Sequence, residues 1–117
     1  MAEFMLFLHE TPGGGNQASP EEIQAVIQEY KDWSQQMAAT GKLVGGDKLT
    51  NDAGRHLTGA GDDLSVTDGP YAEAKELMGG YFRIAADDYD EAVAISRSCP
   101  HLKYGGRIEV RQVHEIG

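Results

Sequence analysis

The stretch Phe4-Met5-Leu6-Phe7-Leu8 decides how the fold begins, because it is a short, unbroken run of apolar residues. The turn-forming segment TPGGGN at 11–16 follows closely, so the run is predicted to be a strand. Side chains alternate along a strand, which places Phe4, Leu6 and Leu8 on one face and Met5 and Phe7 on the other. Both faces are apolar, so we expect both to be covered.

The clearest helix start is SPEE at 19–22. Ser19 can cap the helix, Pro20 suits the first helical position, and Glu22 completes a capping box. Apolar residues then recur at helical spacing, at Ile23, Val26, Ile27, Tyr30, Trp33 and Met37. Gly41 is expected to end this helix as its C-cap.

Further strands are expected at 42–49, 55–59, 64–67, 77–86 and 107–114. A hairpin turn is predicted at 60–63, and Gly45-Gly46 indicates a bulge or a close backbone approach. A second capping box, DYDE at 88–91, opens a helix that continues to Ser96. Pro100 is expected to stop that helix, and 101–106 to form a loop.

The order of these elements is β-α-β, a hairpin, and β-α-β again. It predicts an α+β fold class, a ferredoxin-like β-α-β/β-α-β sandwich with a β-hairpin insertion, in which both helices cover one face of an antiparallel sheet. The other face is left bare, although the first strand is apolar there. We therefore expect a second copy to cover it, giving a homodimer through the sheet face. Residues 1–117 are expected to form a single domain.

Composition narrows the classes of partner. The chain has 117 residues and a formal net charge of −9, which disfavours nucleic acid and anionic membrane surfaces because both require basic patches. Cys99 is the only cysteine, so an intrachain disulfide is excluded and a reducing compartment fits. The apolar run near the N-terminus is too short for a signal or membrane segment. We expect the protein to be cytoplasmic.

The stretch VTDGPYAEAKE at 66–76, followed by Gly79-Gly80-Tyr81, resembles the YCII-related family in its DGPF-domain branch. Tyr71 stands where the branch name has Phe. Supporting matches lie along nearly the whole chain, as SPEE at 19–22, GKLVGG at 41–46, DEA at 90–92 and IEVR at 108–111. The resemblance implies a dimeric α/β barrel built from ferredoxin-like units, in a family whose activity is mostly unknown.

The wider superfamily includes a dehydrochlorinase-like branch that uses a His–Asp pair, with the His on the first helix and the Asp near the second strand. Here the first expected helix carries Tyr30 and Trp33 but no histidine, while Asp47 is a candidate counterpart of the acid. DGPF-type proteins are also often encoded beside extracytoplasmic-function sigma factors. That association implies a role in signalling or stress response.

The DGPY turn at 68–71 has two interpretations. Gly69 and Pro70 favour a rigid turn and Asp68 can bond to the backbone two residues further on, so a structural role is sufficient. The functional interpretation adds the nearby charges, because Asp68, Glu73, Lys75 and Glu76 could act as acids or bases if they face a cleft. Both interpretations stay open.

Candidate site residues follow from these patterns. His9 ends the first strand on the Met5/Phe7 face, as a base in an interface pocket or as a satisfied structural histidine. The candidate catalytic residues are Asp68, Lys75, Glu76 and His9. The candidate ligand-binding residues are the aromatic Tyr30, Trp33, Tyr71 and Tyr81, of which Tyr30 and Trp33 also fit the core.

No metal or cofactor is expected. The histidines lack paired metal-ligand spacing, and the glycine run at 13–15 lacks the Gly-Lys-Ser/Thr of a phosphate loop. The sequence therefore favours a small-molecule enzyme or binding protein that uses acid–base residues near the DGPY turn. The alternatives are a non-catalytic regulatory or ligand-sensing module linked to sigma-factor stress signalling, and a structural partner-binding domain.

Overall fold

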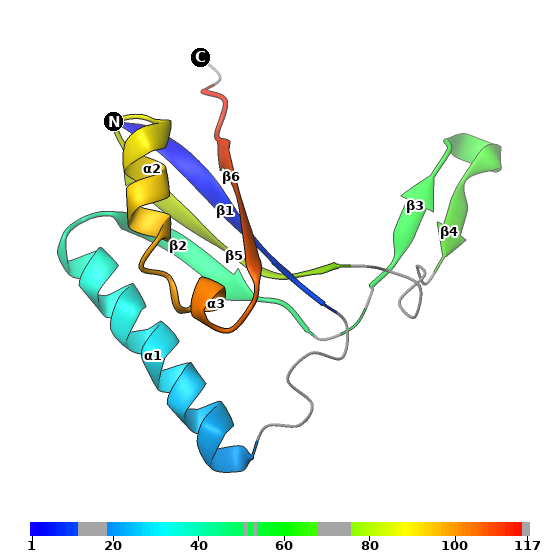
Figure 1. The fold of residues 1–117 in the computed structure, drawn as a ribbon. Coiled ribbons are helices and arrows are strands. Elements are labelled where there is room, and N and C mark those ends of the chain that lie inside the picture. Colours follow the sequence, from blue (N-terminus) through cyan, green and yellow to red (C-terminus); the bar gives the residue numbers. More distant parts are fainter. Residues whose placement is uncertain (12–18, 51, 53, 68–75, 116–117) are drawn as a thin grey trace.

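The structure, a computed structural model, describes residues 1–11, 19–50, 52, 54–67 and 76–115. Figure 1 shows a main sheet with helices beside it and a two-stranded hairpin that extends away from it. The chain is thus an α+β protein, as the sequence predicts.

The main sheet contains β1 (Ala2–Glu10), β2 (Leu43–Lys48), β5 (Leu77–Ala86) and β6 (Arg107–Gln112). The strands lie in the order β2-β5-β1-β6, and every neighbouring pair is antiparallel. The central strands are therefore β1 and β5, which come from the two halves of the chain. The predicted strand at 77–86 matches β5 residue for residue, whereas β2 and β6 are shorter than the predicted 42–49 and 107–114.

The helix α1 (Pro20–Ala39) begins and ends as its sequence predicts. Ser19 Oγ accepts a hydrogen bond from the Glu22 backbone N–H at 3.1 Å. At the other end Gly41 has a φ of 75°, and the Lys42 N–H donates to the Met37 carbonyl oxygen at 2.8 Å. This bond pattern satisfies carbonyls that the last turn would otherwise leave without partners.

Two shorter helices follow, α2 (Tyr89–Ser96) and α3 (Pro100–Lys103). The prediction that 101–106 is a loop is wrong in its first part, because α3 occupies it. Proline cannot continue a preceding helix, but its fixed φ suits the first turn of a new one, so Pro100 begins a helix after α2 has ended. None of the helices in the described ranges is long and apolar enough to cross a membrane.

The core lies between the sheet and the helices. Phe4, Leu6 and Leu8 are buried, while Met5 and Phe7 are only half-buried, which confirms the predicted alternation of β1. The buried cluster draws on both central strands and on the helices, as Phe4, Leu6, Trp33, Ile84, Ala86, Ala92, Ile95 and Cys99.

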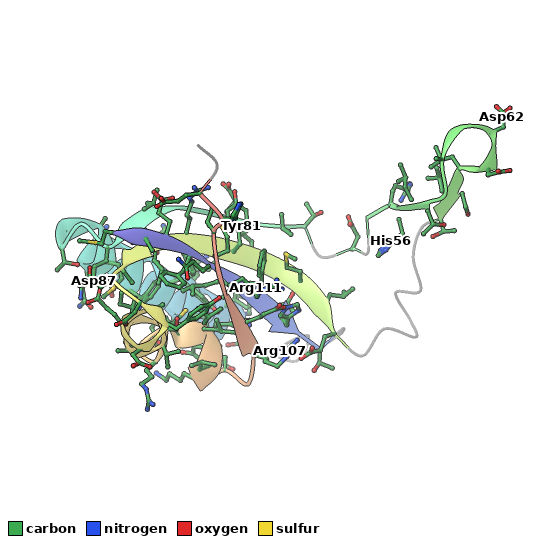
Figure 2. The ribbon with its side chains drawn as sticks, turned by 90° about the horizontal axis from the view of Figure 1, so that it is seen from above. His56, Asp62, Tyr81, Asp87, Arg107 and Arg111 are labelled. Atoms are coloured by element: carbon green, nitrogen blue, oxygen red, sulfur yellow. The ribbon has the colours of Figure 1, made fainter. Side chains whose placement is uncertain are left out.

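The helices α1, α2 and α3 lie on one side of the sheet (Figure 2). We call the other side the open face. Its residues are the strand positions that alternate with the core, namely Asp47, Glu3, Met5, Phe7, His9, Tyr81, Arg83, Arg107, Glu109 and Arg111. The described part of the chain places no helix over this face, so the expected bare side of the sheet is present.

The inserted hairpin pairs β3 (His56–Thr58) with β4 (Ser65–Thr67) around a 3-10 turn at Gly61–Asp63. Both predicted strands are present in shortened form. Every residue from 54 to 67 is exposed.

Glycines allow β2 to approach β5 closely. The register shifts between Leu43 and Gly45, which confirms a bulge. A Cβ on Gly46 would lie 2.7 Å from the backbone oxygen of Tyr81, so a side chain there would push the two strands apart. This approach brings Asp47 opposite Tyr81 on the open face.

Candidate functional site

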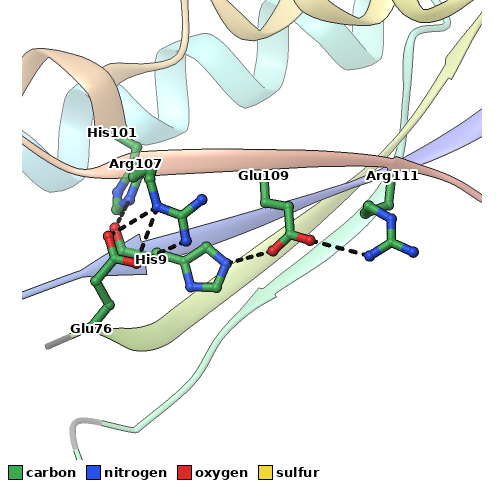
Figure 3. A network of polar contacts seen from close by, with 6 residues as sticks. All are labelled: His9, Glu76, His101, Arg107, Glu109 and Arg111. Carbon is green, nitrogen blue, oxygen red and sulfur yellow. Dashed lines mark hydrogen bonds and ion pairs between the residues drawn. The ribbon is translucent and has the colours of Figure 1, made fainter. Parts of the chain in front are cut away.

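The candidate site lies at the end of the open face where β1 reaches His9. The register of β1 against β5 shifts between Leu8 and His9, and an irregularity of this kind re-aims nearby side chains. The His9 ring points toward β6 (Figure 3), where its Nε2 lies 3.0 Å from Oε1 of Glu109. His9 at the end of β1 and Glu109 of the edge strand β6 thereby form a His–carboxylate pair.

The charge on Glu109 decides where the shared proton lies. The hydrogen bond from His9, followed by one from Arg111 at 3.3 Å, holds the pKa of Glu109 below its usual value. An ionised carboxylate only accepts hydrogen bonds, so Nε2 of His9 is the donor. In the neutral ring Nδ1 is then an acceptor, and no described residue donates to it. Among the described residues, the arrangement is that of an oriented base whose second ring nitrogen receives no hydrogen bond.

Glu76 forms a second ion pair beside His9. Arg107 donates from Nε to both carboxylate oxygens, at 3.1 and 3.0 Å, and from Nη2 at 2.8 Å. These bonds are the largest cause of the lowered pKa of Glu76, to which the nearby His9 also contributes. Arg107 is the ladder partner of His9. Both partners are partly exposed, so the pair adds little stability, but it holds Glu76 next to His9.

Tyr81 and Asp47 lie across the open face from the pair formed by His9 and Glu109. The Tyr81 hydroxyl donates to Oδ2 of Asp47 at 2.7 Å, and this bond to the carboxylate raises the pKa of Tyr81. Phe7 is the ladder partner of both Tyr81 and Glu109, so these two lie two strands apart, or roughly 10 Å. An apolar floor therefore separates a His–Glu pair from a Tyr–Asp pair.

Tyr30 and Trp33 of α1 lie on the other side of the sheet. Trp33 is 4% exposed, packs against Phe82 and donates to Ser98 Oγ at 2.8 Å. The Tyr30 hydroxyl lies 3.1 Å from Nδ1 of His101, and burial raises its pKa well above the usual range. Trp33 thus joins α1 to β5 and to the segment before α3, and Tyr30 joins α1 to α3. Both rings lie on the helix side of the sheet, whereas the His9 ring lies on the open face.

The predicted site residues thus fall into three groups. His9, Glu76 and Tyr81 lie on or beside the open face. Tyr30 and Trp33 lie on the helix side. Asp68, Tyr71, Glu73 and Lys75 lie outside the described residues, so both interpretations of the DGPY turn stay predictions. Glu76 is the first described residue after that segment.

Sequence reasoning missed Glu109, Arg107 and His101 as parts of the site. The alternation of Ile108 and Val110 with Glu109 and Arg111 predicts that Glu109 leaves the core. It does not predict that Glu109 meets His9, because that contact depends on the register between two strands from opposite ends of the chain.

The remainder of the open face offers less chemistry. A shallow hollow of about 300 Å³ lies at its other end, lined by Glu3, Arg83, Val113, His114 and Glu115. None of the predicted site residues lines it. Within the described ranges, no group of three or more His, Cys, Asp or Glu residues is placed to hold a metal ion.

Fold and site together define a small α+β domain whose sheet presents a His–carboxylate pair on an uncovered face. The model of the YCII-related domain matches residues 2–117, and the chain therefore belongs to the YCII-related family. The match confirms the family but does not distinguish its DGPF branch. No curated protein is similar enough to the chain to match it.

Proposed function

We propose that this YCII-related protein binds a small molecule on the open face and transfers a proton to or from it through His9. The observation that carries this proposal is the 3.0 Å contact between Nε2 of His9 and Glu109. A carboxylate that holds one imidazole nitrogen fixes the tautomer and orients the other nitrogen toward a substrate. Such pairing is the usual preparation of a general base.

This geometry supports a proton transfer between His9 and the bound molecule. Nδ1 of neutral His9 accepts a proton from the bound molecule, and Glu109 stabilises the imidazolium that forms. The reverse step returns the proton to the product. Arg111 holds the other oxygen of Glu109, which keeps the carboxylate ionised throughout. Apart from the acidic group of the ligand itself, every group in this step belongs to the protein.

The floor of the site indicates the chemical class of the ligand. Phe7 is a half-buried apolar side chain between the two polar pairs, and the half-buried Met5 lies two residues from it along β1, between Arg83 and Arg111. A molecule with an apolar body could lie on these two apolar side chains, with an acidic C–H, N–H or O–H group near His9 and a polar group near Tyr81.

The proposal includes a second copy of the chain over the open face. The strand order and antiparallel pairing support a ferredoxin-like sandwich, whose bare sheet face must then be covered. The charges on this face are nearly balanced, because Glu3, Glu76 and Glu109 pair with Arg83, Arg107 and Arg111, and Asp47 adds one further carboxylate. In a chain of net charge −9, a balanced surface minimises repulsion between two copies. Two sheets facing each other would form the dimeric α/β barrel.

A non-catalytic ligand-sensing module is the second candidate. It is favoured by the partial exposure of the site, because the side chain of Glu109 is 36% exposed and that of His9 is 17% exposed, whereas chemistry usually requires that water be excluded. In that case the same residues bind a ligand without turnover, and a partner reads the bound state. Coverage by a second copy would remove this argument.

A metabolite screen by thermal shift tests the proposal, because a specific ligand raises the melting temperature by mass action. The wild type is compared with His9→Gln and Glu109→Gln, and His114→Gln is the matched control at an exposed histidine beyond β6. We expect hits that the two site variants lose and the control keeps. Incubation of each hit, followed by mass spectrometry and NMR, separates turnover from binding. Hits that bind all four proteins equally would contradict the proposed site.

A further inference from the structure

His101 is a buried histidine that the proposed proton transfer does not use. It lies in α3 and is only 6% exposed. Its Nε2 lies 2.8 Å from the backbone carbonyl oxygen of His9, and its Nδ1 lies 3.1 Å from the Tyr30 hydroxyl. One ring therefore connects α1 to the strand end that carries the candidate base.

The chemistry of the partners assigns the protons on His101. A carbonyl oxygen only accepts, so Nε2 carries a proton and donates it to His9. Nδ1 of the neutral ring is then an acceptor, and the Tyr30 hydroxyl is its donor. A neutral ring in this tautomer satisfies both contacts. No buried side-chain nitrogen or oxygen among the described residues lacks a hydrogen-bond partner.

Gly106 makes room for this ring. A Cβ at Gly106 would collide with Nε2, Cε1 and Cδ2 of His101. The Gly106 N–H also donates to the His101 carbonyl oxygen at 3.0 Å, which closes the chain after α3. Gly106 thus has no side chain at a position where one would displace the imidazole of His101.

The bond from His101 reaches β1 where its register against β5 shifts, between Leu8 and His9. Backbone groups at such an irregularity lack the full restraint of a regular ladder. The bond of His101 to the His9 carbonyl therefore restrains the backbone of His9, whose side chain donates to Glu109. The His101 ring lies on the helix side of the strand, and the His9 ring lies on the open face.

We propose that His101 is a positioning residue for His9. Through the His9 carbonyl it sets the backbone geometry that directs the His9 imidazole to Glu109, and Tyr30 fixes the tautomer of His101 that makes this possible. The value of this role for turnover rests on the proposed function. The structural coupling itself does not, and it can be measured without a ligand.

The test is the imidazole ¹⁵N–¹H NMR spectrum of the full chain, in wild type and four variants at His101, Ser98 and Tyr30. His101→Phe keeps a ring but removes both hydrogen bonds, and His101→Gln restores a donor near the position of Nε2. Ser98→Ala is the matched control, because it removes the acceptor of the Trp33 bond, which also joins α1 to the segment before α3 but does not touch His9.

We expect the Nε2–H signal of His9 to be lost or averaged in His101→Phe, recovered at least in part in His101→Gln, and unchanged in Ser98→Ala. Tyr30→Phe should weaken the signal without abolishing it, and it decides the question if His101→Phe does not fold. A His9 signal that is the same in every variant would overturn the proposal.

The outcomes separate this inference from the proposed function. If the His9 signal depends on His101 but the metabolite screen has no hits, the coupling stands and the acid–base role fails. If hits depend on His9 but the His9 signal does not change in the His101 variants, the binding role of His9 stands and the coupling fails.

Discussion

His9 donates to Glu109, which is not its ladder partner but its diagonal neighbour on β6. The residue directly across from His9 is Arg107, and that side chain is bound to Glu76 instead. The two ion pairs thus divide the strand end between them, one holding the imidazole and the other holding Glu76. Within the described ranges, this arrangement leaves Nδ1 of His9 without a donor, while Glu76 and Glu109 are each paired with an arginine.

The fit of His101 against Gly106 predicts a steep cost for one added methyl group. Gly106→Ala should destabilise the fold by about 1–3 kcal/mol, because overpacking forces the ring or the backbone to move. Gly45→Ala is the control, since a Cβ there meets no atom within 4 Å, and its effect should stay within about 0.5 kcal/mol. Urea unfolding of both variants measures the difference. Equal stability of the two would show that His101 does not occupy the space beside Gly106.

The lowered pKa of Glu109 predicts a pH dependence with a definite sign. Its value in the folded state lies below the ordinary 4.5 because of the bond from His9 and then that from Arg111. The stabilisation is therefore fully present above the unfolded-state pKa and is lost as the pH falls through the folded-state pKa. The stability advantage of the wild type over Glu109→Gln should shrink as the pH drops below 4.5. If the difference in stability between wild type and Glu109→Gln stayed constant down to acid pH, it would contradict the bonds of Glu109 to His9 and Arg111.

The Tyr81–Asp47 bond predicts a shift in tyrosine ionisation. Asp47 raises the pKa of Tyr81 through a hydrogen bond and its charge. Asp47→Asn should therefore move the ionisation of Tyr81 to lower pH, which ultraviolet titration detects near the tyrosinate band. Tyr81→Phe identifies the contribution of this ring among the five tyrosines. No change in Asp47→Asn would mean that the two side chains do not meet in solution.

The proposed dimer predicts that a charge at the centre of the open face gives a monomer. Phe7→Glu places an unpaired carboxylate between the sheets, which is costly when buried. Size-exclusion chromatography with light scattering should report a dimer for the wild type and a monomer for this variant. Ile27→Glu is the control, because Ile27 is an exposed apolar residue of α1. A wild type that is monomeric at micromolar concentration would contradict the proposed dimer.

The elements that the sequence predicts well are those whose determinants are local. Ser19 and Gly41 bound α1 because caps act within a few residues, and the alternation of β1 follows from its own five apolar residues. The short helix at Pro100 was missed because one proline can end a helix or begin one. Sequence neighbours do not decide between these roles.

The candidate site was predictable only in part, because its contacts join distant segments. From the sequence, His9 and Glu76 are identifiable as polar residues at strand ends and Tyr81 as an aromatic residue within a strand. Their partners Glu109, Arg107 and Asp47 depend on strand order and register. The burial of His101 also depends on tertiary packing, since it requires α1, α3 and the end of β1 to meet. Hydrophobic periodicity in a single sequence does not indicate which distant segments come into contact.

The most direct test of the central claim is the tautomer of the neutral His9 ring in the unliganded protein, read from its ¹⁵N chemical shifts at a pH where those shifts show the ring to be neutral. We expect a single Nε2–H tautomer in the wild type, and a loss of that preference in Glu109→Gln. An Nδ1–H tautomer in the wild type, or a spectrum of His9 that does not respond to Glu109→Gln, would contradict it.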